Sequence, residues 1–295
     1  MQPLAAVAAR IAALTGECCA SAPERSVAGG SINRGYRWPA AGGAMFVKVA
    51  ARASLAAFEA EAAGLAALER TRALRVPRVR AVGSTVDSAF LALEWLESRP
   101  ADQDSERRLG AGLAALHAVT APRFGWQRDN TIGRTPQHND WSDDWTEFFR
   151  ERRLRPQLAL AAHNCLAELG GERGERLLEA LPLLLAGHAP AASLLHGDLW
   201  GGNWLATADG EPAVFDPAVY FWDREADLAM TRLFGGFGAA FYRAYQAITP
   251  AAPGAALRAD LYNLYHVLNH ANLFGGGYAR QAAALIERLL AQVGR

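Results

Sequence analysis

The chain has 295 residues, of which 51% are hydrophobic and 20% are charged, and its 30 basic residues balance its 30 acidic ones. This length fits one large or two medium domains with a sizeable core, and the even charge balance argues against a nucleic-acid partner. The longest apolar stretches, such as residues 181–186, are far shorter than the ~20 residues that span a bilayer. The N-terminus also lacks a basic segment followed by an apolar one, so we expect a cytoplasmic protein without a membrane segment.

The first part of the chain is expected to form a small lobe around a β-sheet. Residues 4–14 have the apolar spacing of a helix. Residues 28–50 have the pattern of strand, glycine turn and strand, and two further short strands are expected at 79–83 and 89–96. The polar, proline-containing segment 97–104 follows these strands. We interpret this segment as a linker to a second lobe.

The second part of the chain is expected to be mainly helical. Between its helices, residues 124–144 have the composition of an aromatic and polar loop. We therefore predict a nucleotide-binding N-terminal lobe over residues 1–97 and a catalytic and substrate-binding C-terminal lobe over residues 98–295. The predicted helices cover residues 106–120, 145–169, 172–185 and 226 to the C-terminus.

The only lysine of the chain, Lys48, is a candidate nucleotide-binding residue. Every other basic residue is arginine, and a position that keeps lysine indicates a tight site that needs a compact cation; chance survival is the alternative. Phe58, Glu61, Leu65 and Leu68 follow at helical spacing, which places Glu61 on an apolar stripe. A carboxylate there needs a partner. Lys48 lies one element upstream and is the lysine available for this role.

The region after residue 192 has the pattern of a phosphoryl-transfer site. A His-Gly-Asp tripeptide ends at Asp198, Asn203 follows five residues later, and Asp216 closes the next predicted strand. Phosphoryl transfer needs an acceptor for the hydroxyl proton, oxygen ligands for magnesium and a cation on the non-transferred phosphates. Asp198 is predicted as the base, Asn203 and Asp216 as Mg²⁺ ligands, and Lys48 as the cation. The pattern therefore predicts a kinase that uses ATP and Mg²⁺.

Four residues near these motifs need a separate interpretation. His196 is expected to fix the loop through backbone hydrogen bonds rather than to transfer protons. Asp227 is expected to bond loop amides from the start of a helix. Gly30 and Ser31 precede the lysine strand. Their backbone amides either cover the nucleotide phosphates or belong to a simple hairpin turn, and both interpretations remain open.

Several longer stretches carry a family resemblance. They are Phe-Gly-Trp at 124–126 with Asp-Asn-Thr-Ile-Gly at 129–133, Trp-Ser-Asp-Asp-Trp at 141–145 with Phe-Phe-Arg-Glu-Arg-Arg-Leu at 148–154, and residues 196–203, 215–220 and 269–278. Together they resemble the fructosamine kinase (ketosamine 3-kinase) family, within the aminoglycoside-phosphotransferase-like superfamily. The resemblance covers most of the chain from residue 29 to residue 280. It implies an α+β, protein-kinase-like fold with a small N-terminal sheet lobe that carries one helix and a larger, mainly helical C-terminal lobe.

The resemblance also implies an activity and a nucleotide site. The expected reaction is ATP-dependent phosphorylation of the third-carbon hydroxyl of a sugar that is joined to an amine as a ketosamine. Glu94, Trp95 and Leu96 fall where the interlobe hinge of the family offers backbone groups to adenine. An ester on the third carbon would lie next to the carbonyl carbon, so the phosphorylated adduct is expected to break down and release the amine. The resemblance thus implies a role in deglycation.

The expected partners are ketosamine small molecules or glycated protein lysines, bound by a monomer or a homodimer. The resemblance favours a sugar-stacking role for Trp200, because aromatic faces bind sugar C–H surfaces; a packed loop aromatic is the alternative. Trp126 and Asp143 are further candidates for substrate contact. Two other functions stay open at this point. One is a kinase of another hydroxylated amine, such as an aminoglycoside or choline, and the other is a non-catalytic pseudokinase.

Overall fold

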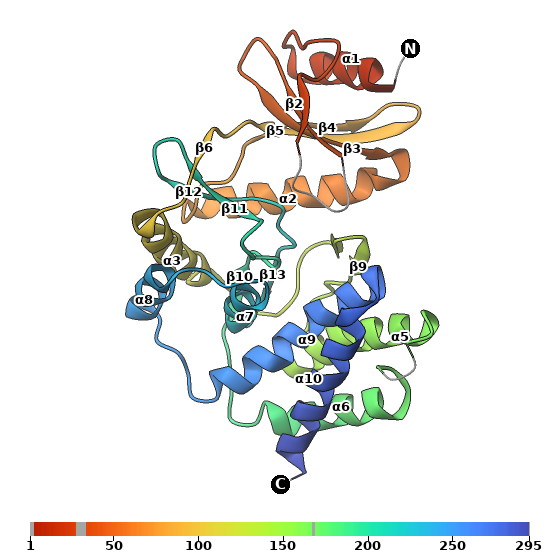
Figure 1. Cartoon of the computed structure of the whole chain (residues 1–295), viewed down its shortest axis with the longest axis vertical. Helices are drawn as coiled ribbons and strands as arrows, with labels where there is room; N and C mark the ends of the chain where they lie inside the picture. The colour runs from red at the N-terminus through yellow and green to blue at the C-terminus, as the bar shows by residue number, and fades with distance from the viewer. Residues whose placement is uncertain (1–2, 28–33, 167–168, 295) are drawn as a thin grey trace.

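The computed structural model describes residues 3–27, 34–166 and 169–294, which form two lobes (Figure 1). A small lobe around an antiparallel sheet comes first in the chain, and a larger, mostly helical lobe follows. Gly30 and Ser31 lie outside the described residues. Among the helices of the described ranges, none is long and apolar enough to cross a membrane.

The elements follow the predicted order, with additional short strands in the C-terminal lobe. The helices are α1 (Pro3–Thr15), α2 (Leu55–Thr71), α3 (Gln103–His117), α4 (Trp145–Phe149), α5 (Arg155–His163), α6 (Gly171–Leu184), α7 (Glu225–Leu233), α8 (Ala239–Ile248), α9 (Ala255–Phe274) and α10 (Gly277–Val293). The strands are β1 (Arg25–Val27), β2 (Arg34–Trp38), β3 (Met45–Ala51), β4 (Val79–Ser84), β5 (Ser88–Glu94), β6 (Ser98–Arg99), β7 (Thr120–Ala121), β8 (Asn130–Ile132), β9 (Thr135–Gln137), β10 (Ala192–Leu195), β11 (Trp204–Thr207), β12 (Pro212–Val214) and β13 (Tyr220–Trp222).

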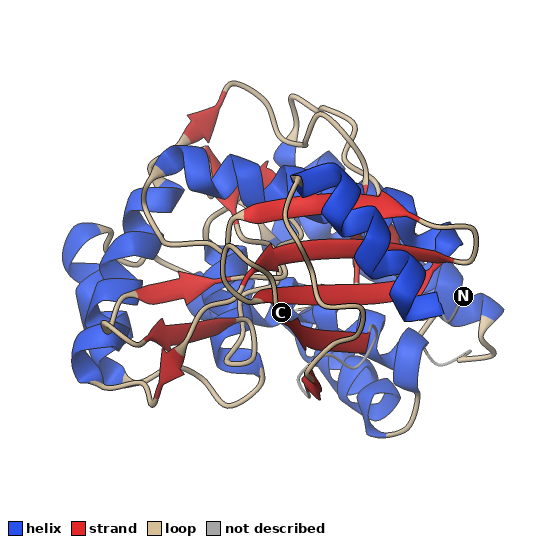
Figure 2. Ribbon diagram, turned by 90° about the horizontal axis from the view of Figure 1, so that it is seen from above, coloured by secondary structure: helices blue, strands red, loops and turns tan. Residues whose placement is uncertain are grey.

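The N-terminal sheet has the strand order β1-β2-β3-β5-β4 and is covered by a helix on each face (Figures 1 and 2). Phe90 and Ala92 of β5 pack in the same core as residues of α1, whereas Leu91 and Leu93 pack in the core that includes α2. Successive side chains of a strand point to opposite faces. Burial on both faces therefore explains why the β5 sequence is an unbroken apolar run.

The pleat of β3 decides where Lys48 points. Met45 and Val47 face the core that includes α1, so Lys48, one residue after Val47, faces the opposite side, where α2 lies. In the sheet register Lys48 stands opposite Gly35 of β2 and Leu91 of β5. The single lysine is thus held on a central strand and directed toward the helix that carries the predicted partner carboxylate.

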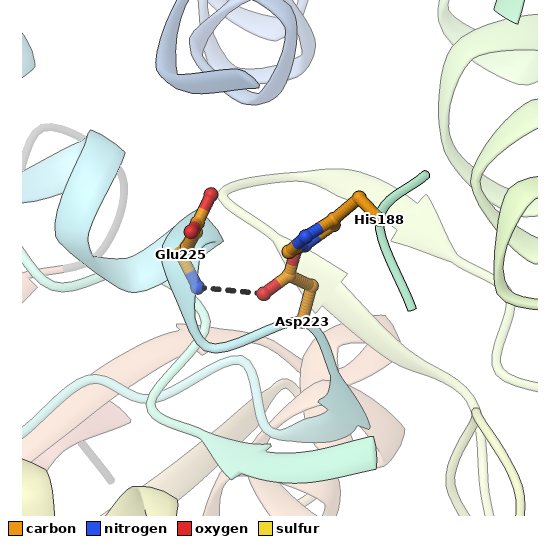
Figure 3. Close-up of side chains that lie close together, drawn as sticks. All are labelled: His188, Asp223 and Glu225. Atoms are coloured by element: carbon orange, nitrogen blue, oxygen red, sulfur yellow. Dashed lines mark hydrogen bonds and ion pairs between the residues drawn. The ribbon is translucent and has the colours of Figure 1, made fainter. Parts of the chain in front are cut away.

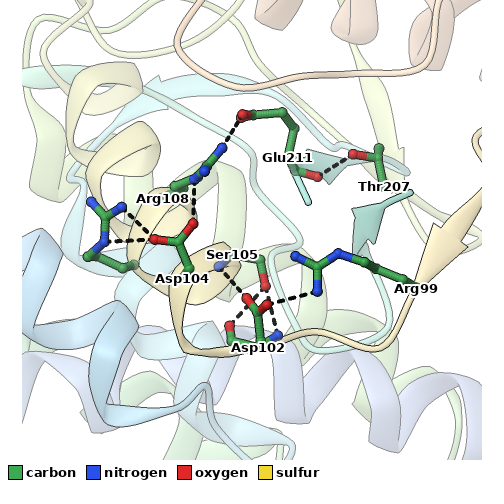
Figure 4. Close-up of polar contacts among 8 residues, drawn as sticks. Arg99, Asp102, Asp104, Ser105, Arg108, Thr207 and Glu211 are labelled. Carbon is green, nitrogen blue, oxygen red and sulfur yellow. Dashed lines mark hydrogen bonds and ion pairs between the residues drawn. The ribbon is translucent and has the colours of Figure 1, made fainter. Parts of the chain in front are cut away.

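The segment predicted as a linker is structured and tied to the C-terminal lobe (Figure 4). Strand β6 pairs with β11, and α3 begins with a capping box in which the Asp102 carboxylate accepts from the Ser105 amide at 2.8 Å. Arg99 donates to the same carboxylate at 2.8 Å. Farther along α3, Arg108 pairs with Glu211 in the β11–β12 hairpin. These contacts connect the end of the N-terminal sheet to the hairpin that precedes Asp216.

The C-terminal lobe is built around α9, which packs against α5, α7 and α10. The long helix predicted for residues 145–169 is shorter and interrupted: α4 passes through a π-helical turn, Arg150–Leu154, into α5, which ends at His163. The predicted loop at 124–144 contains the hairpin β8–β9. These strands have three residues each, which is too short for an alternating pattern to show in the sequence.

Candidate active site

The loop after β10 is held by a buried carboxylate from α7. Asp227 accepts hydrogen bonds from the backbone amides of His196 at 2.7 Å and Gly197 at 2.9 Å, which confirms the role expected for it. Gly197 has a φ of +84°, and a β-carbon there would lie 2.1 Å from the Ala218 carbonyl oxygen. Only glycine fits this turn without displacing the Ala218 backbone.

Asp227 has further partners that the sequence did not reveal. The Nε2 of His117, at the C-terminal end of α3, lies 3.2 Å from the Asp227 carboxylate, and the Nδ1 of His117 lies 2.8 Å from the Tyr245 hydroxyl on α8. A carboxylate only accepts, so Nε2 of this ring carries a proton. The side chains of α3, α7 and α8 thus form one buried chain of hydrogen bonds below the loop that carries Asp198.

His196 fixes the loop from its other side. Its Nδ1 accepts from the amide of Asp198 at 3.3 Å, and its Nε2 lies 3.0 Å from the Phe215 carbonyl oxygen, to which it donates. Burial lowers the pKa of His196 and favours the neutral ring that these two bonds require. The ring therefore fixes the loop through backbone hydrogen bonds, as the sequence predicted, and it also joins the loop to the residue before Asp216.

Asp198, Asn203 and Asp216 come together at the end of this loop. The amide nitrogen of Asn203 donates to the backbone oxygen of Asp198 at 2.8 Å and to its carboxylate at 3.1 Å. Burial, together with the nearby Asp216 carboxylate, raises the pKa of Asp198 to about 7, although the Asn203 hydrogen bond opposes the shift. The Asn203 amide oxygen and the Asp216 carboxylate are hard oxygen donors of the kind that Mg²⁺ prefers, so these residues fit a magnesium ion.

Asp216 has an unusual backbone conformation. It follows β12 with a φ of +57°, the left-handed region that residues with a side chain seldom adopt. Such strain persists only where surrounding contacts impose it, and it is concentrated at functional sites. Here the adjacent Phe215 amide donates to the Asn203 carbonyl oxygen at 3.0 Å. The turn thus directs the Asp216 carboxylate toward the lysine of the N-terminal lobe.

Lys48 bridges the two lobes. Its Nζ lies 2.7 Å from the Glu61 carboxylate on α2 and 2.5 Å from the Asp216 carboxylate. Burial alone would lower the pKa of Lys48, but these two carboxylates outweigh it and hold the pKa above its ordinary value. Burial also raises the pKa of Glu61, although Lys48 opposes that shift. The sequence offered Lys48 as a partner for Glu61 but did not decide whether the two pair in the resting protein; in this structure they do, and Asp216 joins them.

A cavity between the lobes connects the predicted nucleotide-binding residues. Lys48, Asp198 and Asp216 line it, together with Glu61, Asn203 and the predicted hinge residues Glu94, Trp95 and Leu96. The hinge side chains have partners elsewhere: Glu94 pairs with Arg75 and Arg78, and the Trp95 ring lies under the guanidinium groups of Arg25 and Arg37.

The three residues predicted for substrate contact separate into two groups. Trp200 lines the cavity, and its ring folds over Gly202, where a β-carbon would lie 2.3 Å from the indole. Trp126 is buried against Phe221, with ring centroids 5.5 Å apart, and Asp143 is exposed and pairs with Arg123 at 2.8 Å. Neither Trp126 nor Asp143 lines this cavity.

A second polar cluster lies at the start of α7 (Figure 3). His188, Asp223 and Glu225 are residue types that bind metals, and their ligand atoms lie within 4.8 Å of one another. The four carboxylate oxygens and the Nε2 of His188 already have protein partners, however. Asp223 accepts from His188, from the Glu225 amide and from Tyr262, while Glu225 forms a bidentate pair with Arg258. The cluster fixes the first turn of α7, the helix that holds the loop of the site.

The fold and the sequence of this chain have close counterparts among known proteins. A model of the family described as fructosamine kinase matches residues 3–292. A probable ketoamine kinase of Synechocystis sp. is 46% identical and covers 98% of this chain and 97% of its own length. A chloroplastic protein-ribulosamine 3-kinase of Oryza sativa is 40% identical over 90% of this chain and 78% of its own.

Solved structures show the same architecture. The crystal structure of a candidate fructosamine-3-kinase from Haemophilus somnus has a TM-score of 0.88 at 29% identity and covers 97% of each chain. At the level of the fold alone, the likeness extends to the aminoglycoside phosphotransferase APH(4)-Ia, with a TM-score of 0.55, 16% identity and coverage of 90% of this chain and 92% of that one. The chain is therefore an enzyme with the kinase-like phosphotransferase fold, and it belongs to the fructosamine kinase family.

Proposed function

We propose that this chain uses ATP to phosphorylate the third-carbon hydroxyl of ketosamines, with Asp198 as the proton acceptor. The observation that carries the proposal is the meeting of Lys48, Glu61 and Asp216 with Asp198 and Asn203 in one cavity. These are the parts that phosphoryl transfer needs. The relatives named ketoamine kinase and ribulosamine 3-kinase support the substrate class.

The chemistry assigns one task to each of these residues. Asp198 takes the proton of the substrate hydroxyl while the hydroxyl oxygen attacks the γ-phosphorus of ATP. The bond between that phosphorus and the β–γ bridging oxygen breaks at the same time, and ADP leaves. Lys48 holds the non-transferred phosphates, and Glu61 orients Lys48. Asn203 and Asp216 are the residues that would hold magnesium. When bound, magnesium neutralises charge that develops on the phosphate oxygens.

The hinge is proposed to bind adenine through the backbone near Leu96. Among the predicted hinge residues, the amide of Glu94 donates to the Arg78 carbonyl oxygen at 2.8 Å, and the amide of Trp95 donates to that of Ala44 at 3.2 Å. Those two donors are therefore engaged within the N-terminal lobe. We assign the remaining donor role to the Leu96 amide, while the Glu94 and Trp95 side chains contact arginines of the N-terminal lobe.

The consequence of the reaction follows from where the phosphate is placed. In a ketosamine the carbonyl is on the second carbon, so an ester on the third carbon is a leaving group next to an acidifiable position. Enolisation toward the amine-bearing carbon and loss of phosphate then become easier than in the unphosphorylated sugar. We therefore propose that the enzyme removes sugar adducts from amines or protein lysines without a second enzyme. The cytoplasmic location and a monomeric or homodimeric state remain predictions from the sequence.

An ATP-consumption screen tests this function against the alternatives. The substrates are a fructosamine, a ribulosamine, an aminoglycoside and choline, each with and without magnesium. We expect turnover with the ketosamines and little with the other two amines. Turnover confined to the aminoglycoside or choline would move the function to the other amine-kinase class. Nucleotide binding without turnover of any of the four would favour a pseudokinase.

A further inference from the structure

A row of aromatic side chains extends from the active site across the C-terminal lobe. The Trp200 ring lies edge-on to Phe234, with centroids 6.2 Å apart, and Phe234 lies 4.7 Å from His270. His270 in turn contacts Tyr278 at 5.0 Å and Phe274 at 5.6 Å. We call these five residues the aromatic row. They come from the catalytic loop, the C-terminal end of α7, the last turns of α9 and the start of α10.

The aromatic row meets the interlobe cavity at Trp200. Trp200 itself lines the cavity, and so does Gly133 in the turn of the β8–β9 hairpin. That hairpin is fastened to α9 by Asn269, whose side chain accepts from the Thr135 hydroxyl at 2.6 Å and donates to the Ile132 carbonyl oxygen at 3.3 Å. Asn269 immediately precedes a member of the row in the sequence.

The outer part of the row is open rather than part of the core. Phe274 is 52% exposed, and Phe234, His270 and Tyr278 are partly exposed as well. A β-carbon at Gly235, Gly275 or Gly276 would meet no atom within 4 Å, so the glycines beside the row leave free space around it. Exposed apolar patches that adjoin a binding cavity are typical of recognition surfaces.

We propose that the aromatic row binds the amine side of the ketosamine, in particular the methylene chain of a glycated lysine and the adjoining peptide. This inference rests on the proposed function. If Asp198 receives the proton of the third-carbon hydroxyl, the amine on the first carbon lies only two carbons away and leaves the cavity close to that loop. Lys48 and the hinge occupy the nucleotide side in the N-terminal lobe, whereas α7, α9 and α10 lie on the opposite side (Figure 1).

The chemistry of the row matches this occupant. Flat aromatic faces pack well on methylene chains and peptide groups at little cost in side-chain entropy. The Nδ1 of His270 donates to the His266 carbonyl oxygen at 2.8 Å, which leaves the second ring nitrogen for a polar group of the ligand. The row therefore suits an adduct whose amine part varies from one substrate to the next.

The test compares two substrates that share one sugar: a ribulosamine of methylamine and a ribulosyl-lysine within a nine-residue peptide. For each enzyme variant, kcat/KM is measured with both, and the ratio of peptide to methylamine adduct is taken. Phe274→Ala and Phe234→Ala should each lower this ratio on the order of tenfold, mainly through KM for the peptide. Trp141→Ala is the matched control, because Trp141 is also an exposed aromatic, 38% accessible, but packs on Phe221 instead.

The outcomes separate this inference from the proposed function. A ratio that stays within about twofold of wild type in Phe274→Ala overturns the role of the row, and so does an equal fall in Trp141→Ala. Phe274 is exposed, so its variant remains decisive even if Phe234→Ala fails to fold. Wild-type enzyme that phosphorylates neither adduct refutes the proposed function itself. Phe274→Tyr, which keeps the ring, should restore the wild-type ratio.

Discussion

Replacement of Lys48 by arginine tests whether this site needs a compact cation. The Lys48 side chain is 7% exposed and lies between Glu61 and Asp216, whose side chains are 14% and 36% exposed. A guanidinium keeps the positive charge but is broad and planar. It cannot occupy the position of Nζ, within 2.7 Å of one carboxylate and 2.5 Å of the other, without displacing them.

The two substitutions at this position should affect stability differently. Lys48→Met leaves the buried Glu61 carboxylate without its cation, and breaking a buried pair in this way costs ~3 kcal/mol or more. The Asp216 carboxylate is partly exposed and screened by water, so the loss of its pair with Lys48 adds little to the cost in stability. Lys48→Arg keeps the charge, and its larger side chain should lower the free energy of unfolding by roughly 1–3 kcal/mol through overpacking. Arginine should therefore preserve more stability than methionine.

Activity should not follow the same order. Lys48→Met removes the cation that holds the phosphates and Lys48→Arg misplaces it, so we expect kcat to fall by about 10²-fold in each, equivalent to ~2.7 kcal/mol of transition-state stabilisation. The assay is ketosamine-dependent ADP release at saturating ATP and magnesium, with thermal unfolding measured in parallel. Glu61→Gln serves as the matched control, because it removes the partner charge but leaves Lys48 in place. Normal turnover by Lys48→Arg would refute the requirement for lysine.

Further predictions concern the catalytic loop and the core. Asp198→Asn should lower kcat by ~10²- to 10⁴-fold without lowering the melting temperature, and activity within about tenfold of wild type would contradict its role as base. Asp216→Ala should abolish magnesium-dependent nucleotide binding in calorimetry; wild-type affinity with magnesium would contradict its assignment as a ligand. His117→Phe removes a hydrogen-bond partner of Asp227 and should lower stability by ~1–3 kcal/mol and kcat by about tenfold. His117→Gln keeps a donor and should lose less of each. Equal stability and kcat in the two variants would argue against a role for this hydrogen bond. Burial lowers the pKa of His266 to about 3, below the ~6.5 of an unfolded histidine, so its contribution to stability is present above pH 6.5 and is lost as the pH falls toward 3. The free energy of unfolding should therefore fall less steeply with decreasing pH in His266→Gln than in wild type, by up to ~1.4 kcal/mol per pH unit. Denaturant titrations at several pH values measure both slopes, and identical slopes would contradict this prediction.

The parts of the site that the sequence predicted are those fixed by local pattern. Lys48 and Glu61 could be paired because strand alternation and helical spacing direct both side chains into the same core. Asp198, Asn203 and Asp216 could be grouped because one loop and one short hairpin carry all three. Short-range spacing is sufficient for such predictions, since the intervening chain has few ways to fold.

The parts that the sequence did not predict depend on contacts between distant segments. Trp126 was expected at the substrate, but the Gly125 backbone pairs with Phe221, and this isolated bridge turns the tryptophan into the core. The hairpin β8–β9 is secured by Asn269 from a helix near the C-terminus. His117 had no local signal at all, because its partner is carried by another helix. The spacing of apolar residues within one segment carries no information about contacts with a distant segment.

The most direct test of the account is to locate the phosphate on the product. A lysine peptide is glycated with ¹³C-labelled ribose so that the lysine carries a ribulosamine. It is then incubated with the enzyme, ATP and magnesium, and the products are followed by NMR and mass spectrometry over hours. We predict phosphorus coupling to the third carbon of the sugar, followed by decay to the unmodified peptide, and no such signal with Asp198→Asn. A phosphate on another carbon, a stable phosphopeptide, or no transfer to any ketosamine would contradict it.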